Sequence, residues 1–160
     1  MQSASPLLRL LLILAAWTMC VPPAPAQGKS DSKVKLRVTA GKIDDKGYLP
    51  LTLDLTIDEG WYIYANPTGH KNVDGNETVV TVFGTAKLDD VVVDYPKGSP
   101  KKEKYGNDPE FEYRIYNGKV SLQARVKGIA PDAPLEIRVR VFACDGNKCL
   151  TEGTVKAKVE

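Results

Sequence analysis

The feature that most constrains the fold is the alternation of apolar and polar residues along most of the chain. Residues 49–57 are the clearest case, with Leu or Ile at every second position. A period of two sends successive side chains to opposite faces of a β-strand, one toward the core and one toward solvent. The same alternation, or a β-branched or aromatic run, recurs in residues 34–38, 61–64, 78–83, 91–95, 120–126, 135–141 and 155–159. No segment carries a convincing 3.6-residue apolar stripe, so the sequence predicts an all-β chain.

Turn residues separate these segments, for example Asn117-Gly118 and the run from Asp44 to Gly47. About eight short strands with one apolar face each are typical of an immunoglobulin-like antiparallel β-sandwich. The longest stretch without alternation is residues 96–112, which are rich in Lys, Pro and Gly. We expect an irregular loop there, either functional or simply solvated.

The first 26 residues have the pattern of a secretory signal peptide. Arg9 is followed by the apolar run 10–17, and an Ala-x-Ala site ends at Ala26. We therefore expect cleavage of residues 1–26, a flexible leader over 27–32 and one domain over 33–160. The apolar run falls short of the roughly 20 residues of a membrane span, so no stable membrane insertion is expected. A lipoprotein anchored through Cys20 is the alternative, which Met19 at the preceding position disfavours.

The composition excludes several classes of protein. Hydrophobic residues make up 42% of the chain and charged residues 26%, as in ordinary globular domains. With 22 Lys and Arg against 20 Asp and Glu, the net charge is only +2. We therefore expect no nucleic-acid partner, because such proteins carry a basic footprint.

Loss of the signal peptide would remove Cys20 and leave Cys144 and Cys149. Between them stands the four-residue turn 145–148, with a strand before it and another after it. The two cysteines should therefore face each other across a hairpin, with Cα atoms about 4.5–5.5 Å apart. That geometry suits a disulfide, or a dithiol that can become one.

The residues alone leave three roles open for this pair. A permanent staple is one, although a loop of roughly six residues gains only about 2 kcal/mol, against about 4.7 for one of roughly 100. A redox-active pair is the second; Lys148 would favour a thiolate and Asp145 would oppose it. A metal site is the third, but two Cys and His70 fall short of a zinc set, and both Met residues lie in the signal peptide. We expect no cofactor.

Several short motifs occur in a familiar order along the chain. They are Gly-Trp-Tyr-Ile-Tyr-Ala-Asn-Pro at 60–67, Asp-Tyr-Pro at 94–96, Tyr-Gly at 105–106, Tyr-Asn-Gly-Lys-Val at 116–120, and Phe-Ala-Cys at 142–144 with Cys-Leu at 149–150. In this the chain resembles the amino-terminal periplasmic domain of the thiol:disulfide interchange protein DsbD. The resemblance spans roughly residues 34–159, and the cysteine hairpin is its most specific element.

The resemblance implies an immunoglobulin-like fold whose Cys144/Cys149 pair shuttles electrons in the periplasm. Cys149 would form the mixed disulfide and Cys144 would resolve it. The implied partners are a membrane electron-transfer protein, as donor, and oxidised thioredoxin-like periplasmic oxidoreductases. The family continues into membrane and thioredoxin-like domains, so we expect this chain to act as a stand-alone carrier.

The resemblance also implies residues around the pair. Tyr62 and Tyr64 match aromatic residues that line the family's active site, and Glu103, Lys104 and Tyr105 match a cap loop that shields the sulfurs. Lys104 stands where the family commonly has Phe, so either Tyr105 covers the disulfide or the shielding is weaker. We expect Lys104 to add positive potential near the pair. The alternative function is a non-catalytic secreted β-sandwich binding module with a structural hairpin disulfide.

Overall fold

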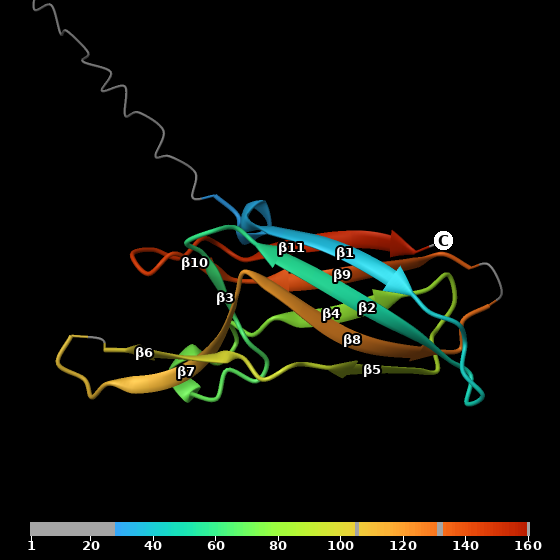
Figure 1. The fold of residues 1–160 in the computed structure, drawn as a ribbon, viewed down its shortest axis with the longest axis horizontal. Helices are drawn as coiled ribbons and strands as arrows, with labels where there is room; N and C mark the ends of the chain where they lie inside the picture. The colour runs from blue at the N-terminus through green and yellow to red at the C-terminus, as the bar shows by residue number, and fades with distance from the viewer. Residues whose placement is uncertain (1–27, 105, 131–132, 160) are drawn as a thin grey trace, which may run out of the picture.

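The structure, a computed structural model, describes residues 28–104, 106–130 and 133–159. Three antiparallel sheets make up the described part of the chain (Figure 1). The first has the order β1 (Val34–Ala40), β2 (Tyr48–Ile57), β8 (Lys119–Lys127), β5 (Asp90–Asp94). The second has the order β10 (Ala143–Cys144), β3 (Tyr62–Tyr64), β7 (Phe111–Asn117), β6 (Ser99–Glu103). The third has the order β11 (Gly153–Val159), β9 (Leu135–Val141), β4 (Val79–Phe83).

The main core lies between the first and third sheets. The alternation of β2, β8 and β9 puts their apolar residues on one face each, and those faces form a single buried cluster. Leu51, Leu53 and Leu55 of β2 are 0% exposed, as are Ile137 and Val139 of β9. The predicted all-β, immunoglobulin-like sandwich is confirmed.

A second, smaller buried cluster lies in the second sheet and is largely aromatic. It includes Tyr62 and Tyr64 of β3, Phe111 and Tyr113 of β7, and Cys144 of β10. The chain enters this sheet directly from the third one, because β9 and β10 are separated only by Phe142. The cysteines are thus attached to the sandwich through a rigid core strand. In Figure 1 the turn after β10 and the turn between β6 and β7 lie at the same end of the molecule.

The expected irregular loop over 96–112 is wrong in part, because β6 occupies Ser99–Glu103 and β7 begins at Phe111. β6 is an edge strand that pairs only with β7, and its residues are all partly or fully exposed. A strand without a buried face needs no apolar alternation, and Pro100 is tolerated at an edge. β7 was missed although Phe111, Tyr113 and Ile115 alternate, because the alternation stops at Tyr116, which is buried next to Ile115.

The N-terminal region also differs from expectation. A flexible leader was predicted over 27–32, but Ser30–Lys33 form a short 3-10 helix, η1, and Ser30 is 0% exposed. Burial of Ser30 is favourable only because its hydroxyl is hydrogen-bonded, and the sequence of a short polar segment does not indicate that such partners will be present. The predicted signal peptide lies outside the described residues. Within the described ranges, no helix is long and apolar enough to cross a membrane.

Candidate functional site

Cys144 and Cys149 form a disulfide across the predicted hairpin. They face each other as an antiparallel pair, with Cα atoms 4.0 Å apart. The backbone bonds of this hairpin lie on either side of the pair: Asp145 N–H donates to Lys148 and Leu150 N–H to Ala143. The cysteines therefore occupy a non-hydrogen-bonded position, the narrower of the two kinds, and their Cα separation lies below even the lower end of the predicted range.

The turn between the cysteines is built by its own polar residues. The Asp145 carboxylate accepts hydrogen bonds from the backbone N–H groups of Asn147 and Lys148, at 2.9 and 3.0 Å. These bonds hold the pKa of Asp145 below its usual range. Gly146 has φ of 92°, a conformation that only glycine adopts readily. A fixed negative charge thus stands beside Cys144.

The two cysteines differ sharply in their access to solvent. Cys144 pairs with Tyr62 in the second sheet and is 0% exposed. Cys149 lies on the outer arm of the hairpin and is exposed. A thiolate from another protein can therefore attack Cys149 Sγ, whereas Cys144 is reached only through Cys149.

Tyr64 is the side chain that contacts both sulfurs. Its hydroxyl lies 3.7 Å from Cys144 Sγ and 4.0 Å from Cys149 Sγ. Because disulfide sulfurs carry no hydrogen, the hydroxyl is the donor in any hydrogen bond to them. A donor in this position can also stabilise a thiolate after the disulfide opens.

The Tyr62 hydroxyl belongs to a separate series of side-chain hydrogen bonds. Its hydroxyl is 3.3 Å from that of Tyr113, which in turn donates to Glu103 Oε2 at 2.8 Å. Burial raises the pKa of both tyrosines, and the neighbouring Glu103 raises that of Tyr113 further, so both stay protonated at neutral pH. Tyr113 also stacks on Tyr64, with ring centres 5.5 Å apart. This series of hydrogen bonds connects Glu103, at the end of β6, to Tyr62 of β3 through Tyr113.

The structure thus brings Tyr62, Tyr64 and Glu103 together around the disulfide region. Lys104 follows β6 and is exposed. Lys101 contacts the aromatic cluster, with its Nζ 4.8 Å from the Tyr62 ring centre. Tyr105 lies outside the described residues.

Sequence reasoning missed Tyr113 and Lys101. The alternation of Phe111, Tyr113 and Ile115 was a usable signal for a buried Tyr113. No sequence signal indicated Lys101, because its position depends on the pairing of β6 with β7, which puts Lys101 opposite Tyr113. His70, considered above only as a possible zinc ligand, is partly buried and stacks on Phe111 with ring centres 4.5 Å apart. No group of three or more His, Cys, Asp or Glu in the described ranges could hold a metal ion.

The fold and the site define a class: an immunoglobulin-like β-sandwich that presents a disulfide, half buried and half exposed, on a short hairpin at one end. The family model of the N-terminal part of the thiol:disulfide interchange protein DsbD matches residues 31–160. The chain belongs to this family. No curated protein matches it.

Several solved structures share the fold, two of which come from Proteus mirabilis and Neisseria meningitidis. The N-terminal periplasmic domain of ScsB from Proteus mirabilis has a TM-score of 0.53 at 20% identity. The match covers 78% of this chain, which spans only 45% of the length of that one. The N-terminal domain of Neisseria meningitidis DsbD in its reduced form has a TM-score of 0.52 at 10% identity, with 83% of this chain and 89% of that chain covered.

Proposed function

We propose that this domain is a thiol–disulfide exchange module that works in the periplasm. It would carry reducing equivalents through Cys144 and Cys149, from a membrane electron-transfer protein to oxidised thioredoxin-like oxidoreductases. The observation that carries the proposal is the asymmetry of the disulfide in a chain of this family: Cys149 is exposed and Cys144 is 0% exposed. A disulfide that only stabilises the fold does not require one of its cysteines to be exposed to solvent.

The chemistry follows from that asymmetry. In the reduced domain, the Cys149 thiolate attacks one sulfur of the partner's disulfide, forming a mixed disulfide and releasing the partner's other sulfur as a thiolate. The Cys144 thiolate then attacks Cys149 Sγ, which forms the internal disulfide and releases the partner's remaining thiolate. Two electrons pass from the domain to the partner. Attack of a membrane donor's dithiol on Cys149 would reverse these steps and reload the domain.

The proposal is tested by trapping the mixed disulfide. A Cys144→Ala variant keeps the exposed thiol but lacks the resolving one, so it should accumulate a covalent complex with an oxidised thioredoxin-like protein. The matched Cys149→Ala variant keeps only the buried thiol and should trap at least tenfold less complex. Non-reducing gel electrophoresis and mass spectrometry measure both. Equal trapping by the two variants would contradict the assignment of roles, and no complex with either would favour the binding module.

A further inference from the structure

The N-terminal residues form a third arm beside the cysteine hairpin. We call residues 28–33 the N-terminal strap. Ser30 N–H donates to the Thr151 carbonyl at 3.0 Å, and Thr151 N–H donates to the Gly28 carbonyl at 3.3 Å. Lys29 and Thr151 form a parallel bridge, in contrast to the antiparallel pairing of the sheets. The strap is therefore hydrogen-bonded to the arm that leaves Cys149.

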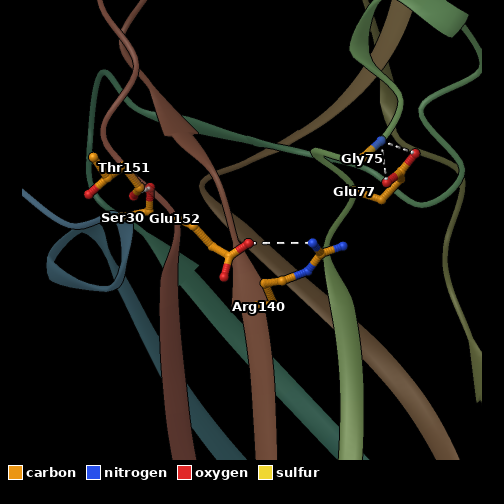
Figure 2. A network of polar contacts seen from close by, with 6 residues as sticks. All are labelled: Ser30, Gly75, Glu77, Arg140, Thr151 and Glu152. Atoms are coloured by element: carbon orange, nitrogen blue, oxygen red, sulfur yellow. Dashed lines mark hydrogen bonds and ion pairs between the residues drawn. The ribbon is translucent and has the colours of Figure 1, made fainter.

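The Ser30 hydroxyl joins the two arms of the hairpin. It donates to the Thr151 carbonyl at 2.7 Å and accepts the Ala143 N–H at 2.9 Å. Ala143 precedes Cys144 directly, and Thr151 follows Cys149 by two residues. Figure 2 shows Ser30 next to Thr151, where η1 meets the arm that leads into β11. Ser30 is 0% exposed, so no water replaces either bond.

The packing around the strap shows that the arrangement is closely fitted. Gly153 lies against it so tightly that a Cβ there would come within 2.2 Å of the Asp31 backbone nitrogen. An ion pair between Arg140 of β9 and Glu152, just before β11, is 3.4 Å long and lies at the surface (Figure 2). An exposed pair of this kind contributes little. Ser30 thus links the two arms through a buried side chain, in addition to the disulfide and the backbone bonds between the strands.

We infer that Ser30 is a positioning residue for the redox pair: its hydroxyl holds the arms of Cys144 and Cys149 together when the disulfide is open. This inference rests on the proposed function and adds a residue that acts through the backbone rather than on the sulfurs. In the mixed disulfide, it keeps the Cys144 thiolate facing Cys149 Sγ for the resolving attack.

The hydrogen bonds of Ser30 favour the oxidised form. With the disulfide closed, the arms are already fixed, and the bonds form at no further cost in chain entropy. With the disulfide open, the same bonds must also order the arms, which offsets part of their contribution. Loss of the hydroxyl therefore destabilises the oxidised form more than the reduced form, and reduction becomes easier.

The test compares Ser30→Ala with Ser32→Ala. Ser32 lies in the same strap, but its exposed hydroxyl donates to the Lys29 carbonyl and does not reach the hairpin. Each protein is equilibrated with glutathione redox buffers, and the oxidised fraction is measured by alkylation and mass spectrometry. Ser30→Ala should shift the equilibrium about fivefold toward the dithiol, equivalent to about +20 mV, because the reduced form retains only part of the stabilisation from the two hydrogen bonds. Ser32→Ala should match the unchanged protein within twofold.

Equal equilibrium constants for the two variants would overturn the inference. Hydrogen exchange at the Ala143 amide gives a second measurement on the unchanged protein, independent of whether Ser30→Ala folds. That amide should stay protected after reduction, and exchange at the rate of an exposed amide would overturn the inference as well. Neither measurement uses a protein partner. The inference and the proposed electron transfer can therefore fail separately, because transfer to a protein partner is tested by the trapping experiment and not by these two measurements.

Discussion

At the scale of single residues, the two tyrosines of β3 have different relations to the disulfide. The Tyr64 hydroxyl is within 4.0 Å of both sulfurs, whereas the Tyr62 hydroxyl is bonded to Tyr113. Both are buried and both stand on the same short strand. The pair therefore offers a matched comparison, in which only one hydroxyl can act on the sulfur chemistry.

We expect Tyr64→Phe to raise the pKa of the reactive thiol, because the thiolate loses a hydrogen-bond donor. Alkylation of the reduced protein by iodoacetamide should become about threefold slower at neutral pH, with the pH profile displaced to higher pH. Tyr62→Phe is the control and should leave the profile in place. An unchanged profile for Tyr64→Phe, or an equal displacement in both variants, would contradict the role given to Tyr64.

Sequence and structure agree least at this scale. The resemblance placed Tyr62, Tyr64 and Glu103 near the pair, because each matches a motif along the chain. It could not identify Lys101 or Ser30, since their contacts depend on which strands become neighbours. Lys101 contacts Tyr62 only because β6 pairs with β7, and Ser30 lies over 100 residues away in sequence from the hairpin that it joins.

At the scale of elements, the cysteine hairpin is held from three directions. β10 pairs with β3, the outer arm pairs with the strap, and β9 and β11 continue as a ladder from Val141 opposite Gly153. The alternation of β9 and the turn residues at 145–148 were enough to predict the hairpin. The edge strand β6 and the strap were not predictable in this way, because neither has a buried apolar face.

Gly153→Ala should destabilise the domain by about 1–3 kcal/mol, because the new methyl group collides with the backbone of Asp31 rather than with a flexible side chain. Urea unfolding of the oxidised protein measures the change. The control is Gly28→Ala in the strap itself, where the added Cβ would be 3.8 Å from Leu150, an ordinary contact. A Gly153→Ala protein as stable as Gly28→Ala would show that the strap does not pack against β11 as described.

At the scale of the whole molecule, the residues of the main core are largely different from those around the disulfide. The main core of Leu, Val and Ile lies between the first and third sheets, whereas Cys144 belongs to the aromatic cluster of the second sheet and Cys149 is exposed. The alternation predicted the sandwich because each strand must bury one face. The order of strands within each sheet was not predictable, since many orders bury the same faces. A domain with such a core does not depend on one short disulfide loop, so that disulfide is free to open.

The reduction potential of the Cys144–Cys149 disulfide tests the central claim most directly. It is obtained by equilibrating the oxidised domain with dithiothreitol or glutathione buffers of known poise and measuring the dithiol fraction. Structural disulfides lie below about −300 mV, and pairs that exchange electrons lie above that value. We predict a reduction potential above about −300 mV for this disulfide. A potential below about −300 mV would contradict it and identify the disulfide as a permanent part of the hairpin.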